Sequence, residues 1–258
     1  MMTSVPAELA GLVLAAGAGQ RLRPLTRLRP KPLCPVADVP LVDLGLQRVV
    51  PHVAEVAVNV HHGADVIATH VAGRAHVSHE VERPLGTAGA VGFLRPWLDG
   101  RAVLVVNGDA WTPSSLDPLL EGWDGERLRV AIATDGELRA GAPVAGALLP
   151  AAAVARCEPV PSGLWGHLWK PSLADGQLET INVHGPFVDC GTPADYLRAN
   201  LLASGGRSVV GEGAEVEGQL VRSVVWPGAR VEAAERLVDA IRADDLTVLV
   251  RPRRGDVD

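Results

Sequence analysis

A short glycine-rich turn near the N-terminus is the first segment that could bind a phosphate. The apolar run Leu12-Val13-Leu14 is followed directly by Ala15-Ala16-Gly17-Ala18-Gly19. Small residues after a buried strand let backbone N–H groups approach a phosphate closely. The segment is neither a dinucleotide fingerprint nor a Walker loop, because Leu22 stands where the third glycine would be needed and no Gly-Lys-Ser/Thr follows. A bare G-x-G is weak evidence alone.

Basic residues and prolines follow this turn. Arg21-Leu22-Arg23-Pro24-Leu25-Thr26 precedes Arg29-Pro30-Lys31-Pro32, and Lys31 is one of only two lysines in the chain. Arg21 offers a planar fork for phosphate oxygens, whereas Lys31 offers a compact point charge. A basic, solvated loop is the alternative interpretation, but it accounts only for the charges and not for the prolines and glycines.

Apolar runs alternate with helix-like segments in the first half of the chain. Strands are expected at 9–15, 54–60 and 102–106, and helices at 42–50, 64–71 and 88–94. This alternation predicts an α/β fold with a Rossmann-like, mainly parallel sheet covered by helices on both faces. Ligands of such sheets gather beyond the carboxyl ends of the strands, so we expect the site in the loops after Ala15, His79 and Val106.

The second half of the chain predicts a domain boundary. Further strands are expected between 128 and 149 around the turn-rich stretch 134–143, and a last helix at 193–202. Thr192 suits its N-cap and Pro193 its first turn. Gly205-Gly206 then reads as a linker, which divides the chain into a main domain, 1–204, and a tail, 205–258.

The tail contains two copies of a V-x-x-G-A-x-V unit. They are Val210–Val216 and Val225–Val231, and their six-residue apolar spacing indicates hexapeptide β-helix repeats. A coincidental pair of glycine turns between strands is the alternative. The tail has room for about two coils, fewer than the roughly three that a free-standing solenoid needs. We therefore expect it to pack on the main domain or on another subunit.

The first loop resembles the opening signature of the sugar-1-phosphate nucleotidyltransferases, L-A-A-G-x-G-x-R-L-x-P-L-T followed by P-K-P. Three more segments match this family in order. Pro84–Gly89 resembles its base-recognition loop, Asn107-Gly108-Asp109 its first metal motif, and Val188–Leu197 its W-x-D-I-G-T-P-x-D-Y-L segment. The four motifs span residues 9 to 203, and a hexapeptide tail also occurs in many members. The resemblance implies a nucleotide-diphospho-sugar transferase fold with a short left-handed β-helix tail.

The resemblance also implies an activity. A nucleotidyl group would pass from a nucleoside triphosphate to a sugar-1-phosphate, with release of pyrophosphate and with Mg²⁺ as cofactor. Because both reactants are anions, positive charge and alignment matter more than acid–base chemistry. Mg²⁺ suits a site with one or two carboxylates that shares its other ligands with phosphates and water.

Particular residues acquire roles by this resemblance. Arg21, Lys31 and Asp109 are the implied catalytic residues, and Asp109 and Asp189 the implied metal ligands. On their own, Asp109 also fits a simple turn and Asp189 a helix cap. The implied nucleotide-binding residues are Leu14, Ala15, Ala16, Gly17, Gly19, Glu82, Gly86, Thr87 and Gly108.

The base is less closely specified than the phosphates. An L-G-T-A-G loop is more typical of guanylyl- and uridylyltransferases than of thymidylyltransferases. Glu82, just upstream, offers a carboxylate to the two donors on one edge of guanine, which favours GTP, with UTP or dTTP as alternatives. In the other interpretation, backbone carbonyls accept these hydrogen bonds from guanine and Glu82 is simply solvated.

The sugar half of the site departs from the family pattern. The Glu-Lys-Pro segment that binds the sugar phosphate and the Asn-Ala-Gly segment that contacts the sugar are absent, and no lysine lies between Asp109 and Lys170. Gly146 and Lys170 are the sugar-binding candidates that remain, with Arg139 and Arg156 as further substitutes. A catalytically weak paralogue that binds a nucleotide or nucleotide-sugar and regulates a partner is therefore the second hypothesis.

Composition and charge limit the partners. The net charge of −6 argues against binding to nucleic acid or to an anionic membrane. The chain shows no N-terminal leader pattern and no run of about 18 apolar residues, so a cytoplasmic location is expected. The small tail predicts a homo-oligomer, since such tails often mediate subunit contacts in the family that the chain resembles.

Overall fold

The computed structural model describes residues 9–134 and 136–251. Close contacts between residues divide the chain into two units, and neither is a continuous segment. The first unit comprises the described residues of Met1–Ala18, Val42–Gly108 and Thr112–Phe187. The second comprises those of Gly19–Leu41, Asp109–Trp111 and Val188–Asp258. None of the helices in the described ranges is both long enough and apolar enough to span a membrane.

The described part of the first unit is built on a seven-stranded sheet, in the order β10-β8-β9-β6-β1-β4-β5. Its strands are β1 (Leu9–Leu14), β4 (Glu55–Val60), β5 (His76–His79), β6 (Ala102–Asn107), β8 (Leu128–Ile132), β9 (Val144–Leu149) and β10 (Leu178–Asn182). All pairings are parallel except those of β9 with β6 and β8. The predicted mainly parallel α/β sheet is thus confirmed. β9 reverses because a short connection after β8 can only join antiparallel strands.

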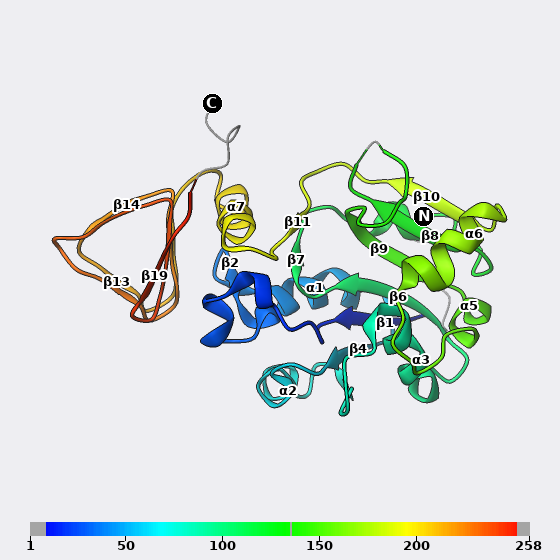
Figure 1. Cartoon of the computed structure of the whole chain (residues 1–258). Helices are drawn as coiled ribbons and strands as arrows, with labels where there is room; N and C mark the ends of the chain where they lie inside the picture. The colour runs from blue at the N-terminus through cyan, green and yellow to red at the C-terminus, as the bar shows by residue number, and fades with distance from the viewer. Residues whose placement is uncertain (1–8, 135, 252–258) are drawn as a thin grey trace. The chain divides into compact units, whose positions relative to one another are not determined.

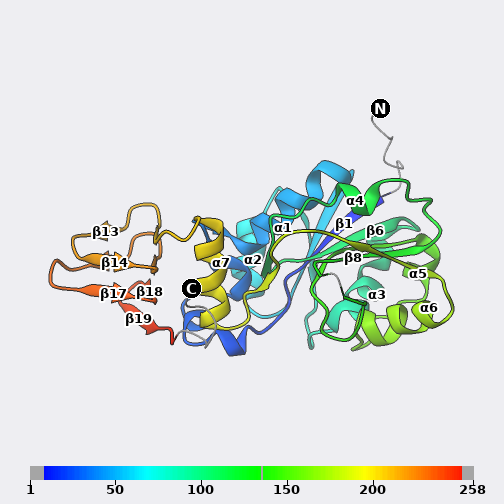
Figure 2. The ribbon, with the colours of Figure 1, turned by 90° about the horizontal axis from the view of Figure 1, so that it is seen from above.

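Helices cover both faces of this sheet. In Figure 2, α3 (Gly86–Leu98), α5 (Ala151–Ala155) and α6 (Lys170–Ala174) lie on one side of the strands, and α1 (Leu41–Val49) and α4 (Asp117–Leu120) on the other. α2 (Ala64–Val71) packs against β4 and β5. Strand alternation explains the two faces: Leu12 belongs to the buried cluster under α3, whereas the next residue, Val13, contacts α1.

The predicted helices are confirmed, with one extension. α1 and α2 agree with the predicted ranges to within a residue, whereas α3 begins at Gly86 and ends at Leu98 rather than covering only 88–94. The first turn of α3 is stabilised from outside the helix, because the N–H groups of Ala88 and Gly89 both donate to the carbonyl of Ser162. These amides have no partner inside the helix, so an external acceptor lets the helix begin earlier.

The second unit combines short elements from three parts of the chain. β7 (Ala110–Trp111) pairs antiparallel with β11 (Val188–Asp189), and β2 (Pro35–Val36) pairs with β3 (Val39–Pro40). α7 (Pro193–Ala203) follows β11. Thr192 caps this helix as predicted, since its side chain accepts a hydrogen bond from the backbone N–H of Asp195 at 3.2 Å.

The tail of the second unit is a small coil with three faces, seen as a triangle in Figure 1. One face pairs β12 (Val209–Val210), β15 (Val224–Val225) and β18 (Ala240–Ala243), and β19 (Leu246–Leu249) closes it antiparallel. The others pair β13 (Glu215–Val216) with β16 (Arg230–Val231), and β14 (Gln219–Val221) with β17 (Arg236–Val238). The two predicted repeats stack in register, with Val216 beside Val231. Residues 252–258 of the predicted tail lie outside the described residues, and the boundary at 204 stays a prediction.

A buried aromatic pair joins this tail to the rest of the second unit. The Nε1 of Trp226 donates to the hydroxyl of Tyr196 on α7 at 2.9 Å, and that hydroxyl donates to the carbonyl of Pro35. Both side chains are fully buried. The guanidinium of Arg29 lies 4.4 Å from the centre of the Trp226 ring. The tail therefore packs against the segment that carries Lys31.

Candidate active site

Four charged side chains converge in the second unit. The Nζ of Lys31 lies 2.9 Å from Oδ2 of Asp109 and 2.7 Å from Oδ1 of Asp189. The Nη2 of Arg21 lies 3.2 Å from Oδ2 of Asp189. The structure thus brings together the residues for which the resemblance implies catalysis and metal binding. We call these four residues the charged cluster.

Strand pairing brings the two aspartates of the charged cluster close together. Asp109 directly precedes β7, and Asp189 is the last residue of β11. In the antiparallel pair of these strands, Asp189 lies opposite Ala110, the residue after Asp109. Lys31 begins a 3-10 turn directly after Pro30, whose ring restricts the backbone at the start of this turn.

Two glycines leave room for the charged cluster. A Cβ on Gly191 would lie 2.8 Å from Nη2 of Arg21 and 3.1 Å from Oδ2 of Asp189, so a side chain there would disturb this ion pair. Gly19 has a positive φ of 59°, and a Cβ there would lie 2.9 Å from Cβ of Lys31. Gly19, a predicted nucleotide-binding residue, therefore also allows the loop to close onto the Lys31 segment.

The cluster combines one buried cation with more open partners. The side chain of Lys31 is only 5% exposed, against 36% for Asp109, 53% for Asp189 and 74% for Arg21. Burial by itself lowers the pKa of Lys31, but the neighbouring carboxylates of Asp109 and Asp189 outweigh it, and the pKa ends above its usual value of 10.5. Lys31 therefore keeps its charge throughout the neutral range.

The two carboxylates suit a magnesium ion in their chemistry. They already share one cation, the ammonium of Lys31, and Oδ1 of Asp109 accepts no hydrogen bond from any described residue. Hard carboxylate oxygens that are partly open to solvent match the ligands Mg²⁺ prefers. No group of three or more His, Cys, Asp or Glu side chains within residues 9–134 and 136–251 could hold a metal. The remaining ligands of a bound Mg²⁺ would therefore be phosphate and water oxygens.

The glycine-rich turn of the first unit is held by neighbouring strands. The N–H of Ala15 donates to Oδ1 of Asn59 at 2.9 Å, and the N–H of Gly108 donates to the carbonyl of Leu14 at 2.9 Å. Gly17 is exposed, and no atom lies within 4 Å of the place that a Cβ would take there. The turn is thus anchored at its start and open at Gly17, which leaves space for a ligand to approach the backbone.

A buried polar network, which sequence reasoning missed, connects this turn with the predicted base-recognition loop. The Nδ2 of Asn59 donates to Oε1 of Glu80 at 2.7 Å, and the backbone N–H of Leu85 donates to Oε2 of Glu80 at 2.7 Å. Asn59 is 3% exposed and Glu80 is 2% exposed. The only signal in the sequence is a polar Asn within an apolar strand. One carboxylate therefore fixes the positions of both loops.

Replacing Glu80 by alanine is expected to lower the free energy of unfolding by about 2 to 4 kcal/mol, because it leaves two buried donors, on Asn59 and Leu85, without an acceptor. Thermal melts of the variant measure this. Glu82→Ala is the matched control, since that carboxylate is exposed and its loss should stay within about 0.5 kcal/mol. Equal melting temperatures for the two variants would show that the network does not stabilise the loops.

The predicted base-recognition loop contacts a second chain segment. The hydroxyl of Thr87 accepts a hydrogen bond from the N–H of Leu164 at 2.8 Å, and the N–H of Ser162 donates to the carbonyl of Leu85 at 2.9 Å. Gly86 has a positive φ of 70°. Glu82, predicted to read guanine, is exposed, and the buried carboxylate of this stretch is Glu80 instead.

A cavity of about 220 Å³ opens beside this loop in the first unit. Gly146, a predicted sugar-binding residue, lines it together with Thr87 and with Trp165 and Trp169 of a π-helical turn. Lys170, the other candidate, is exposed and is not among the residues that line the cavity. Arg139 and Arg156 do not line it either. The structure thus brings Gly146, but not Lys170, to this cavity.

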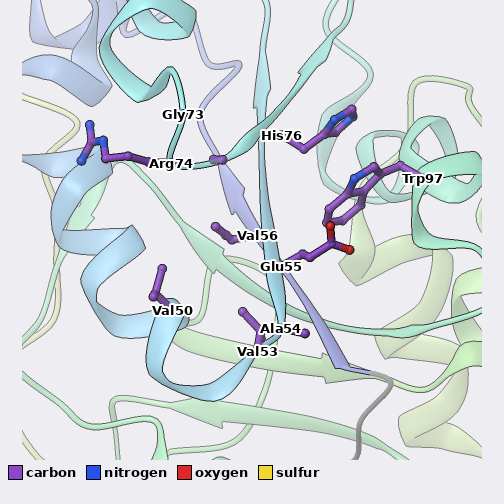
Figure 3. Close-up of a pocket in the computed structure, with 10 residues that line it drawn as sticks. Val50, Val53, Ala54, Glu55, Val56, Gly73, Arg74, His76 and Trp97 are labelled. Atoms are coloured by element: carbon purple, nitrogen blue, oxygen red, sulfur yellow. The ribbon is translucent and has the colours of Figure 1, made fainter.

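Another hollow, of about 370 Å³, lies at the amino ends of strands of the same sheet (Figure 3). Glu55 and His76, at the amino ends of β4 and β5, line it, and the ring of His76 stacks on Trp97 with centroids 5.0 Å apart. Ligands of such sheets bind at the carboxyl ends of the strands. This hollow is therefore not the expected substrate site.

Comparison with known proteins agrees with this geometry. Residues 10–135 match the nucleotidyl transferase family. An N-acetylmuramate alpha-1-phosphate uridylyltransferase from Caulobacter vibrioides is 37% identical over 134 residues, which cover 47% of this chain and 55% of that protein. A mannose-1-phosphate guanylyltransferase from Mycobacterium tuberculosis is 28% identical over 131 residues, 48% of this chain and 36% of that protein. The chain thus spans about half, or less, of these relatives' lengths.

A solved structure from Thermus thermophilus, described as a mannose-1-phosphate geranyltransferase, matches with a TM-score of 0.69. The match covers 94% of this chain and 95% of that one at 17% identity, so it shows the fold alone. The matched range 10–135 includes the glycine-rich turn and three members of the charged cluster, Arg21, Lys31 and Asp109. Residues 10–135, which carry these side chains, thus match the nucleotidyl transferase family, and the two relatives reported above are named as sugar-1-phosphate nucleotidyltransferases.

Proposed function

We propose that this protein transfers a nucleotidyl group from a nucleoside triphosphate to a sugar-1-phosphate, forming a nucleotide sugar and releasing pyrophosphate. The observation that carries the proposal is the charged cluster, in which Lys31 lies within 2.9 Å of both Asp109 and Asp189. The reaction joins two anions, so it needs fixed positive charge more than a general base. The cluster supplies two cations and two carboxylates suited to a metal ion.

The proposed chemical step needs no proton transfer. An ionised phosphate oxygen of the sugar-1-phosphate forms a bond to the α-phosphorus, and the bond from that phosphorus to the bridging oxygen breaks. Pyrophosphate leaves with the electron pair, in line with the attack. Lys31 holds a fixed charge beside the transferred group, while the exposed guanidinium of Arg21 can grip two phosphate oxygens. Mg²⁺, held by Asp109 and Asp189, would neutralise charge on the phosphates.

The nucleotide is proposed to be GTP or UTP. Glu82 is the residue that favours guanine in the sequence, but its side chain is exposed. The Caulobacter relative is named for uridylyl transfer and the Mycobacterium relative for guanylyl transfer, and the former is the more similar at 37% against 28% identity. A comparison of initial rates with GTP, UTP and dTTP decides among these bases.

Pyrophosphate release is the direct test. The protein is incubated with Mg²⁺, each nucleoside triphosphate in turn and a panel of sugar-1-phosphates, and release is expected only when one of each is present. Chelation of the metal by EDTA should abolish release, and excess Mg²⁺ should restore it. Asp109→Asn should lower the rate by about 10²-fold or more, because the metal loses a charged ligand. Absence of release from the whole panel would refute the proposal.

A regulatory paralogue that binds a nucleotide sugar without turnover is the second candidate. The observation that favours it is the cavity that Gly146 lines in the first unit, because its lining residues include no lysine or arginine. Nucleotide binding measured by calorimetry, combined with no pyrophosphate release, would support this candidate. The presence of both Asp109 and Asp189 at 2.7 to 2.9 Å from Lys31 favours the enzyme, because a binding protein has little need for two metal ligands.

Further proposals concern the whole protein. We propose a nucleotidyltransferase domain at 1–204 with a left-handed β-helix tail at 205–258, built on the hexapeptide repeats. The tail is proposed to mediate a homo-oligomer, and the protein to act in the cytoplasm, with no nucleic-acid or membrane partner. Light scattering at micromolar concentration tests the assembly, and a monomeric mass would refute it.

A further inference from the structure

Two consecutive histidines follow β4 and contact two different loops. The Nδ1 of His62 lies 3.1 Å from the carbonyl oxygen of Ala16 in the glycine-rich turn. The Nδ1 of His61 contacts the carbonyl oxygen of Glu80, which precedes the predicted base-recognition loop. The two rings meet edge to face, with their centroids 4.6 Å apart. The chain after β4 therefore contacts both loops through two side chains outside the charged cluster.

The contact between His62 and Ala16 has a fixed polarity. A carbonyl oxygen can only accept a hydrogen bond, so Nδ1 of His62 carries the proton and donates it. In a neutral ring this assigns the tautomer, and in a charged ring both nitrogens carry protons. The hydrogen bond therefore persists whether the ring is neutral or charged.

This hydrogen bond fixes the direction of the peptide that joins Ala16 to Gly17. The one cis peptide bond within the described ranges joins Arg23 to Pro24, so the bond from Ala16 to Gly17 is trans. In a planar trans peptide the C=O and the following N–H point in opposite directions. Because the carbonyl of Ala16 points at His62, the N–H of Gly17 points away from it.

The amide that His62 directs in this way is free to bind a ligand. Gly17 is exposed, and its N–H donates to no acceptor among residues 9–134 and 136–251. The two residues before it are buried, and the N–H of Ala15 already donates to Asn59. A free backbone N–H in a turn after a strand is the kind of donor that binds phosphate oxygens. His62 therefore contacts the turn on the side opposite to its free donor.

We propose that His62 is a positioning residue for the nucleoside triphosphate, because it sets the direction of the Gly17 N–H before the nucleotide binds. This inference rests on the proposed transferase function and adds a residue to its nucleotide site. A donor that is already oriented binds more tightly, since less free energy is lost in ordering the turn. Without the hydrogen bond from His62 the peptide can rotate, because glycine allows many backbone conformations. His62 acts through the turn rather than by touching the nucleotide.

Two substitutions separate the hydrogen bond from the ring. His62→Phe keeps an aromatic ring but removes the donor. His62→Asn removes the ring but keeps a donor, because the amide nitrogen of asparagine lies as many bonds from the backbone as Nδ1 of histidine. His167→Phe is the matched control, since the ring of His167 also contacts a backbone carbonyl, that of Arg156 at 2.8 Å, but on the π-helical turn.

Calorimetric titration with UTP and with GTP, in Mg²⁺ and without a sugar phosphate, measures nucleotide binding without turnover. His62→Phe is expected to raise the Kd of the nucleotide that binds by about 5- to 10-fold, the usual net effect of losing one hydrogen bond. His62→Asn should stay within about twofold of the unchanged protein, because its donor replaces the lost one. His167→Phe should leave the Kd unchanged.

Kinetics and thermal melts test whether the effect is one of positioning. In the pyrophosphate assay the KM of His62→Phe for the nucleotide should rise by the same factor with kcat nearly unchanged, because the turn binds substrate and transition state alike. Its melting temperature should stay within about 2 °C of the unchanged protein, since His62 is exposed. A lower kcat at unchanged KM, or a lost melting transition, would overturn the positioning role.

The outcomes separate this inference from the proposed function. Equal nucleotide affinity of His62→Phe and the unchanged protein would overturn the inference and leave the transferase intact. Equal losses in His62→Phe and His62→Asn would show that the ring is required rather than the hydrogen bond, and would also overturn it. Weaker binding in His62→Phe alone, without pyrophosphate release from the unchanged protein, would support the inference and refute the transferase. Binding of neither nucleotide to the unchanged protein would overturn both.

Discussion

Replacing Lys31 by methionine is expected to lower kcat for pyrophosphate release by about 10²- to 10³-fold, the usual effect of removing one fixed group that stabilises charge in a transition state. Lys31 is the buried cation of the charged cluster, and its ammonium contacts both Asp109 and Asp189. Methionine fills similar space without the charge. The reacting phosphates would lose a cation that is fixed before the substrates bind.

The stability of the Lys31→Met variant should change little. Both carboxylates that it leaves behind are partly exposed, at 36% and 53%, so water can solvate them when the ammonium is removed. We expect a loss of about 1 kcal/mol or less, as for exposed ion pairs, rather than the larger cost of an unpaired buried charge. A thermal melt separates this activity defect from unfolding.

Arg27→Met is the matched control for this substitution. Arg27 lies in the same segment, is exposed and forms no ion pair with any residue in the described ranges. The Arg27→Met substitution removes the same formal charge from the same part of the second unit. Because Arg27 is not part of the charged cluster, kcat should be unchanged. If the two variants had equal activity, Lys31 would not take part in the reaction, and the charged cluster would be a structural ion pair.

The central strands of the fold follow from the sequence because their apolar runs are continuous. β1, β4 and β6 agree with the predicted ranges to within a residue, since strands buried on both faces need apolar residues throughout. β10 differs, because Leu178–Asn182 is an edge strand in which only Leu178 is buried. Its sequence, Leu-Glu-Thr-Ile-Asn, carries no run that distinguishes it from a loop.

The site was predictable where motifs are local and hidden where contacts are distant. The resemblance identifies Arg21, Lys31, Asp109 and Asp189, but their distances depend on the pairing of β7 with β11, which no local pattern predicts. The polar network of Glu80 arises in the same way, because its acceptor oxygens meet donors from separate segments. The cavity lined by Gly146 is likewise visible only once β6, β9 and the π-helical turn are assembled.

The tail is expected to stabilise the segment that carries Lys31, and Trp226 is the residue that tests this. Replacing Trp226 by alanine should lower the free energy of unfolding by about 3 to 5 kcal/mol, since it removes a fully buried aromatic side chain. For a chain of this length each kcal/mol lowers the melting temperature by roughly 2 to 4 °C. The substitution also removes the donor to Tyr196 and the ring beneath Arg29.

Other contacts in the second unit point the same way. The backbone N–H of Ala37 donates to Oδ1 of Asn200 on α7 at 3.0 Å, and the N–H of Glu212 in the tail donates to Oδ2 of Asp38 at 3.0 Å. The hairpin of β2 and β3 is therefore held by both α7 and the coil. Loss of Trp226 should loosen residues 19–41 together with the tail rather than the tail alone, and activity should fall with them.

Limited trypsin digestion followed by mass spectrometry measures this coupling. Within 19–41 only the bonds after Arg21 and Arg27 are open to trypsin, because Arg23, Arg29 and Lys31 each precede a proline. The alanine variant of Trp226 should be cut after Arg21 and Arg27 sooner than the unchanged protein, below the temperature at which its helical signal is lost. Trp123→Ala is the control in the first unit and should leave both bonds protected. Cuts confined to the tail would mean that the Lys31 segment is held by its own turn contacts, and that the coil does not position the charged cluster.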